Sequence, residues 1–179
     1  NSKKNYAELT SQCRVGLILI LDFFKKTTPH KNEIVFSSYN LPAMINIAKQ
    51  LNFKIVFCPI IINDGSFNLK MLKKKINKKT LALVQTNMFN SPKNSIEIKK
   101  ICKKNKIALI EDNAIYFDNY FKQGRKKVFS GSFGDFTIYS FNIMKNISAL
   151  YGGAVSFNSN QFKLFYDKNI NKYNSFPIS

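Results

Sequence analysis

The chain has 179 residues, enough for one domain, and 45% of them are hydrophobic, so it can bury a substantial core. Its formal net charge is +18, but only Arg14 and Arg125 are arginines, and the lysines are spread along the chain. Because arginine is the residue favoured for bidentate contacts with phosphates and bases, this composition argues against a specific nucleic-acid-binding protein.

Helical periodicity and short apolar runs alternate along the first two thirds of the chain. The predicted order is helix 14–26, strand 34–36, helix 42–51, strand 54–58, helix 69–76, strand 81–85, helix 96–105 and strand 107–110. This alternation indicates right-handed βαβ units and a mostly parallel sheet. The apolar strands are continuous, which is typical of strands covered on both faces. We therefore predict a three-layer α/β/α fold.

The regular alternation of strands and helices ends in the last third of the chain. Strands are predicted at 136–141 and 154–157, and the loop between them is too short for a helical crossover, so one of the two is expected to run antiparallel. A helix at 161–168 follows. We expect residues 1–168 to form one incomplete domain and 169–179 to be an irregular tail, with the core of a second domain absent.

Three candidate sites lie at the ends of predicted elements, where ligands bind in open α/β sheets. Asp112 lies two residues beyond the end of a predicted strand, beside Glu111, and Ser140 and Lys145 lie at and just beyond the end of a later strand. The helix start at 13–15 offers free amide groups that suit a phosphate. Each feature alone has an ordinary explanation: a helix cap, a solvated lysine or an uncapped helix.

Together these features match the needs of pyridoxal phosphate (PLP). This cofactor requires a lysine that forms an imine, a carboxylate that keeps the pyridine nitrogen protonated, and a hydroxyl and helix start for the phosphate. The helix start comes first, then Asp112, then Lys145. That is the order found in the large domain of the aspartate-aminotransferase type of fold.

Several sequence blocks resemble, in order, those of the DegT/DnrJ/StrS family of sugar-nucleotide aminotransferases. The resemblance extends from about residue 14 to residue 168 and is carried by 33–43, 67–69, 87–89, 110–114, 131–135, 139–141 with Lys145, and 152–155. It implies the large domain of a PLP enzyme that transfers an amino group from glutamate to a nucleotide-linked keto-sugar. It also implies a homodimer, a small C-terminal domain that this chain lacks, and a role in surface polysaccharide or amino-sugar biosynthesis.

The resemblance also implies residue roles. Lys145 would bond to the cofactor and act in catalysis, Asp112 would pair with the pyridine nitrogen, Ser140 would contact the phosphate, and residues 13–15 would supply amide groups. Dehydratases related to this family have a histidine at the position of Lys145, which favours amino transfer. The residues expected around the cofactor are Cys13, Arg14, Val15, Leu41, Asp112, Ile115, Ser140 and Lys145.

Five positions depart from the family pattern. Leu41 stands where the family usually has an aromatic residue, Ile115 where it has Gln or His, and Tyr151 where an acidic residue is common. Cys13-Arg14 replaces a common Gly-Thr pair. Two alternatives therefore stay open: a PLP enzyme of this fold with a non-sugar substrate, and a non-catalytic homologue that binds a ligand or partner in the same cleft.

Other site classes find no support in the sequence. Cys13, Cys58 and Cys102 are too widely spaced for a zinc site and odd in number, which argues against a disulfide framework, so a reducing cytoplasm is expected. The only histidine, His30, falls in a predicted turn, so no histidine-based triad or metal cluster is expected. The apolar run at 15–21 is too short to span a bilayer, and no membrane association is expected.

Overall fold

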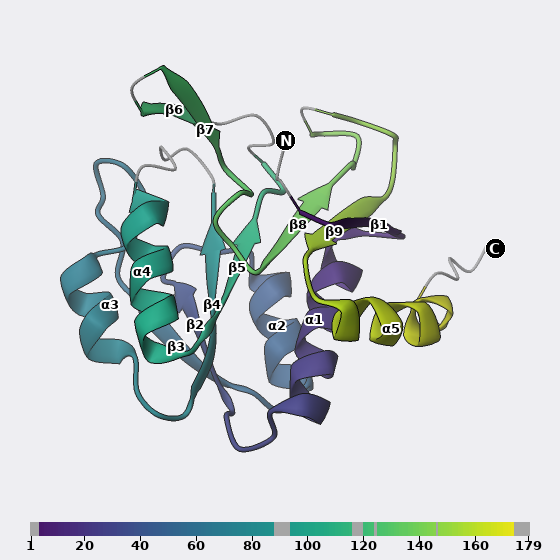
Figure 1. Cartoon of the computed structure of the whole chain (residues 1–179), viewed down its shortest axis with the longest axis horizontal. Helices are drawn as coiled ribbons and strands as arrows, with labels where there is room; N and C mark the ends of the chain where they lie inside the picture. The colour runs from purple at the N-terminus through teal and green to yellow at the C-terminus, as the bar shows by residue number, and fades with distance from the viewer. Residues whose placement is uncertain (1–3, 88–93, 116–119, 124, 146, 174–179) are drawn as a thin grey trace.

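The computed structural model describes residues 4–87, 94–115, 120–123, 125–145 and 147–173. They form a seven-stranded sheet with helices on both faces, and a separate two-stranded hairpin projects beyond one end of the sheet (Figure 1). In spatial order the sheet strands are β1 (Tyr6–Thr10), β9 (Gly153–Phe157), β8 (Phe136–Ser140), β5 (Ala108–Asp112), β4 (Thr80–Thr86), β2 (Glu33–Ser37) and β3 (Lys54–Cys58). The hairpin consists of β6 (Tyr120–Gln123) and β7 (Lys126–Phe129).

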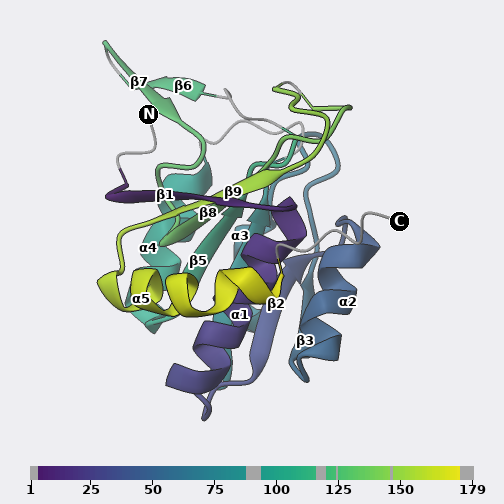
Figure 2. The same ribbon diagram turned by 90° about the vertical axis from the view of Figure 1, so that its right-hand side faces the viewer.

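Helices cover the sheet in two separate layers. They are α1 (Cys13–Thr27), α2 (Pro42–Gln50), α3 (Leu69–Lys75), α4 (Ser95–Asn105) and α5 (Asn160–Asn169), followed by the short 3-10 helix η2 (Ile170–Lys172). Figures 1 and 2 show α3 and α4 on one side of the sheet, with α1, α2 and α5 on the other. No helix in the described ranges is long and apolar enough to cross a bilayer.

The strands run as the sequence predicts. Strands β3, β2, β4, β5 and β8 pair in parallel, whereas β9 is antiparallel to both of its neighbours, β8 and β1. The expected antiparallel strand is therefore β9. The three-layer α/β/α fold with a mostly parallel sheet is confirmed.

The central strands are buried on both faces, which explains their continuous apolar sequences. Ile34 and Phe36 of β2 pack in the cluster that includes α1 and α2, while Val35 packs in the cluster that includes α3 and α4. Successive strand residues point to opposite faces, so one apolar run supplies both cores. The parallel strands all end on the same side of the sheet, which we call its carboxyl edge, and the two cores fix these strands in position.

The sequence patterns missed strands β1, β6 and β7. Strand β1 lies at the edge of the sheet and alternates exposed with less exposed residues, and its apolar Leu9 is 73% exposed. Strand β7 begins with two exposed lysines, Lys126 and Lys127, and among the described strands it pairs with β6 alone. Neither segment carries the continuous apolar run that marked the central strands.

The chain beyond residue 168 is more regular than expected. Asn169 ends α5, and η2 follows because Ile170 packs into the core cluster that contains α1. An irregular tail starting at residue 169 was thus the wrong prediction for these positions. Residues 174–179, and residues 88 and 89 of one family-like block, lie outside the described residues.

Candidate functional site

A cavity of about 560 Å³ lies at the carboxyl edge of the sheet. Its walls come from the turn before α1, the loop between β2 and α2, the ends of β4, β5 and β8, and the loop between β8 and β9. Among the residues that line it are Cys13, Arg14, Leu41, Asp112, Ile115, Ser140 and Lys145. Every residue predicted to surround a cofactor, except Val15, therefore meets in one place.

The start of α1 is ordered by the carbonyl of Gln12. That oxygen accepts hydrogen bonds from the Thr10 hydroxyl at 2.9 Å and from the Val15 backbone N–H at 3.0 Å. The Val15 side chain packs in the core, so Val15 offers this cavity neither its amide nor its side chain. The prediction of a cofactor contact from Val15 finds no support in this geometry.

Arg14 adds a positive charge at the same helix start. Its Nε and Nη2 atoms donate to the side-chain oxygen of Gln12 at 3.1 and 2.7 Å, which fixes the guanidinium beside the cavity. The first turn of α1 carries no acidic residue, and no side chain of the described residues caps it. A helix start with free amide groups and an adjacent arginine suits an anion.

Asp112 is a buried carboxylate at the end of β5. Its Oδ1 atom accepts a hydrogen bond from the Ala114 N–H at 3.0 Å. Burial raises the pKa of Asp112 to about 6, and the Ala114 hydrogen bond and the charge of Lys145 limit that rise. At neutral pH the carboxylate is mostly ionised, so it can pair with a protonated ring nitrogen.

Lys145 and Ser140 reach the cavity from the β8 side. Ser140 is the last residue of β8 and pairs with Gly153 of β9. Lys145 lies in the following loop, where its backbone N–H donates to the Asn142 carbonyl at 2.9 Å. Lys145 is half-buried, and its charge lowers the pKa of Asp112 across the cavity.

A buried polar network lies behind Asp112. The neighbouring Glu111 and Asn113 point away from the cavity, as alternation along a strand requires. Glu111 is fully buried and accepts backbone N–H bonds from Gly131 at 2.9 Å and Gly134 at 2.6 Å. The Asn113 side-chain oxygen accepts from Asn87 Nδ2 at 2.6 Å. These bonds fix the end of β5, and with it the position of Asp112.

Several cavity residues were not predicted from the sequence. They are Gln12, Tyr39, Asn40, Thr86, Asn142, Met144 and Gly152. Asn40 Nδ2 donates to Thr86 Oγ1 at 2.8 Å, tying the loop after β2 to the end of β4. Asn40 follows β2 and Thr86 ends β4, so the rule that located Asp112 at the carboxyl end of a strand also applies to them.

Replacing Asp112 with asparagine is expected to stabilise the cofactor-free protein at neutral pH. The folded pKa of about 6 lies above the ordinary 3.8, so the folded state holds more protons between these values and loses stability as pH rises through them. The variant lacks this cost and should gain up to about 3 kcal/mol above pH 6. Asparagine keeps an oxygen for the Ala114 N–H.

Urea unfolding of both proteins at pH 7.5 and pH 4 measures this difference. The gain should be large at pH 7.5 and shrink toward zero at pH 4, where Asp112 is already protonated in the folded state. An equal gain at both pH values would show that ionisation of Asp112 is not the cause.

The fold is that of the large domain of PLP-dependent transferases. More narrowly, the chain belongs to the DegT/DnrJ/EryC1/StrS aminotransferase family, whose family model matches residues 2–166. This is a family of PLP-dependent enzymes that modify nucleotide sugars, and its relatives include both transaminases and dehydratases.

Similar proteins illustrate that range. A UDP-4-amino-4,6-dideoxy-N-acetyl-beta-L-altrosamine transaminase of Helicobacter pylori is 27% identical over 82% of this chain and 38% of its own length. The solved structure of Helicobacter pylori PseC, an aminotransferase of pseudoaminic acid biosynthesis, has a TM-score of 0.75 at 26% identity, covering 91% of this chain and 44% of that one.

A dehydratase has the same fold. The Escherichia coli GDP-4-keto-6-deoxy-D-mannose-3-dehydratase with bound hydrated PLP gives a TM-score of 0.78 at 22% identity, covering 91% of this chain and 42% of that one. This chain thus spans about two fifths of the length of the proteins it resembles.

Proposed function

We propose that the protein carrying this chain is a PLP-dependent aminotransferase. It would transfer an amino group from glutamate to a nucleotide-linked keto-sugar, in the cytoplasm, for surface polysaccharide or amino-sugar biosynthesis. The observation that carries the proposal is that Lys145 and buried Asp112 line one cavity at the carboxyl edge of the sheet. In this proposal residues 1–168 belong to the cofactor-binding domain, and a small C-terminal domain completes the enzyme.

The cavity residues fit PLP at both ends. A buried, mostly ionised carboxylate at Asp112 suits a protonated pyridine nitrogen, and the α1 start with Arg14 and Ser140 suits a phosphate. Leu41 and Ile115 add apolar surface in place of the more polar or aromatic side chains usual in the family. When bound, the cofactor supplies an electron-withdrawing ring that stabilises negative charge on the carbon next to an amine.

Each side chain has a defined task in this mechanism. Asp112 holds the proton on the ring nitrogen and thereby maintains the ring's capacity to accept electrons. The amine of Lys145 would be the group that takes up and releases the proton moved during amino transfer. Arg14 and Ser140 hold the phosphate, so the reacting atoms stay within reach of Lys145.

The lysine at position 145 favours amino transfer over dehydration within this family. Leu41, Ile115 and Tyr151 favour a second candidate, a PLP enzyme of the same fold with a non-sugar substrate, because they change the apolar and charged character of the cavity rim. A non-catalytic homologue is the remaining alternative, and the presence of both Asp112 and Lys145 argues against it.

We further propose that the protein is a homodimer with its sites near the interface. Three apolar side chains that line the cavity are largely exposed: Leu41 at 55%, Met144 at 90% and Tyr151 at 67%. A second copy packed against this rim would remove that surface from water and close the cavity.

The full-length protein, loaded with PLP, tests this function with glutamate as the only substrate. One equivalent of 2-oxoglutarate per chain should be released, because the first half of amino transfer needs no sugar. Adding nucleotide-linked keto-sugars should then yield an amino-sugar nucleotide, detected by its mass. A protein that binds PLP but releases no oxo-acid from any amino donor would contradict an aminotransferase.

A further inference from the structure

A second cavity, of about 710 Å³, lies between α4 and β7. It shares no lining residue with the cavity at Asp112. Five of its lining residues are lysines, three from α4 and two from β7, and none is acidic. The lysine-rich lining of this second cavity is therefore not explained by the proposed PLP chemistry.

Three of these lysines, Lys99, Lys103 and Lys126, have no ion-pair partner among the described residues. The other two are engaged: Lys100 pairs with Glu97 at 2.7 Å, and Lys127 lies 4.4 Å from the ring centre of Tyr120. Asp135 lines a neighbouring hollow with Lys99 but forms no ion pair with it. The cavity thus presents positive charge from two separate elements.

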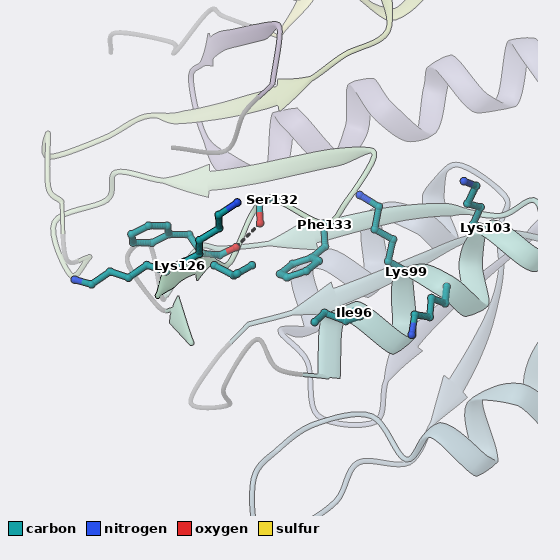
Figure 3. A pocket seen from close by; sticks show the side chains of 10 residues that line it. Ile96, Lys99, Lys103, Lys126, Ser132 and Phe133 are labelled. Atoms are coloured by element: carbon teal, nitrogen blue, oxygen red, sulfur yellow. Dashed lines mark hydrogen bonds between the residues drawn. The ribbon is translucent and has the colours of Figure 1, made fainter. Parts of the chain in front are cut away.

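The floor between the lysines is apolar and partly aromatic. Phe133 is buried at 8% exposure, and Ile96, Val128 and Phe129 are half-buried beside it. Figure 3 shows Lys99 and Lys126 on opposite sides of Phe133, with their amino ends turned toward the same side. An apolar floor flanked by ammonium groups differs from an ordinary solvated lysine face, which has only water to contact.

We propose that this cavity binds a nucleoside phosphate. Ammonium groups of Lys99 and Lys126 would hold the phosphates, and the base would lie against Phe129 and Phe133, since aromatic side chains stack on the faces of bases. The volume lies within the range of about 300 to 1,000 Å³ that is typical of small-molecule pockets. One cavity of this size favours a mononucleotide over a nucleic-acid strand or an acidic protein.

Titration calorimetry of the full-length, PLP-loaded protein tests the site with UDP, GDP and ADP as separate probes. At least one nucleotide should bind, more tightly than inorganic pyrophosphate and more tightly than the free nucleoside. Both comparisons are needed because lysines alone bind pyrophosphate, and an apolar floor alone binds a nucleoside.

The double variant Lys99→Gln/Lys126→Gln should weaken nucleotide binding by about tenfold or more, because it removes two charge-assisted contacts. The matched control is Lys73→Gln/Lys74→Gln, two exposed lysines of α3 with the same change of net charge, which should leave binding within about twofold. Phe129→Ala should weaken nucleotide binding several-fold and leave pyrophosphate binding unchanged, about the loss expected from one stacked base.

Several results would overturn the nucleotide site. These are no binding of any probe, equal losses in the two lysine pairs, or pyrophosphate that binds as tightly as the nucleotides. Tighter binding of a single-stranded oligonucleotide or of polyglutamate at the same lysines would also overturn it. A loss with Arg14→Gln equal to that with Lys99→Gln/Lys126→Gln would place the nucleotide in the cavity at Asp112, which leaves the proposed aminotransferase intact.

Discussion

Replacing Lys145 with alanine in the full-length protein is expected to lower amino transfer by roughly a thousandfold or more. Lys145 is the lysine among the residues that line the cavity at Asp112. In the proposed mechanism its removal would take away both the covalent attachment and the proton carrier. The rate of 2-oxoglutarate release measures the effect. Borohydride treatment of the PLP-loaded protein, followed by peptide mass analysis, should place the modification on the peptide that contains Lys145.

The matched control for this experiment is Lys168→Ala. Lys168 lies on α5, is exposed and does not line the cavity. That variant should keep its activity and its borohydride labelling at Lys145. The Lys145→Ala protein should still bind some PLP noncovalently through Asp112, Ser140 and the α1 start. If borohydride labels both variants equally, the cofactor has reacted with surface lysines and the proposed mechanism is wrong.

The sequence alone predicted the central part of this fold because one physical signal marks it. The run from β2 to β5 alternates apolar strands with helices, and burial on both faces leaves little room for polar residues in those strands. Strand β1 escaped prediction because it lies at the sheet edge with half of its residues toward solvent. Strand β1 is positioned by its pairing with β9, which lies nearly 150 residues later in the chain. A local hydrophobic pattern cannot predict a strand of this kind.

The candidate site was predictable to a similar extent. Asp112 and Ser140 end strands, and a parallel sheet gathers such positions at one edge, so their meeting follows from topology. The role of Glu111 could not be predicted from the sequence. Its partners are backbone N–H groups of the turn at Gly131 to Gly134, and no local pattern around Glu111 indicates them. The cavity between α4 and β7 could not be predicted either, because no local sequence pattern indicated strand β7 or its position beside α4.

A substitution at Gly153 is expected to damage the site through packing alone. Gly153 pairs with Thr10 of β1 and with Ser140 of β8, and it approaches the start of α1 closely. A Cβ atom at Gly153 would lie 2.4 Å from the backbone nitrogen of Cys13 and 2.7 Å from the carbonyl carbon of Gln12. Backbone atoms cannot rotate away as a side chain can, so Gly153→Ala must push β9 away from the α1 start.

The expected cost of Gly153→Ala is about 3 kcal/mol or more of the free energy of unfolding, at the upper end of ordinary overpacking. PLP affinity should fall as well, because the displaced turn is the one that offers Arg14 and free amide groups to the cavity. Urea unfolding and PLP titration of the full-length protein measure the two effects.

Gly65→Ala is the matched control, because it separates crowding from backbone strain. Gly65 has a φ of +68°, but no atom lies within 4 Å of a Cβ built there, so this variant carries only the cost of a left-handed conformation, about 1 to 2 kcal/mol. Gly65 does not line the cavity at Asp112, and its substitution should leave PLP affinity unchanged. If Gly153→Ala loses no more stability than Gly65→Ala and binds PLP normally, then β9 does not pack against the α1 start as described.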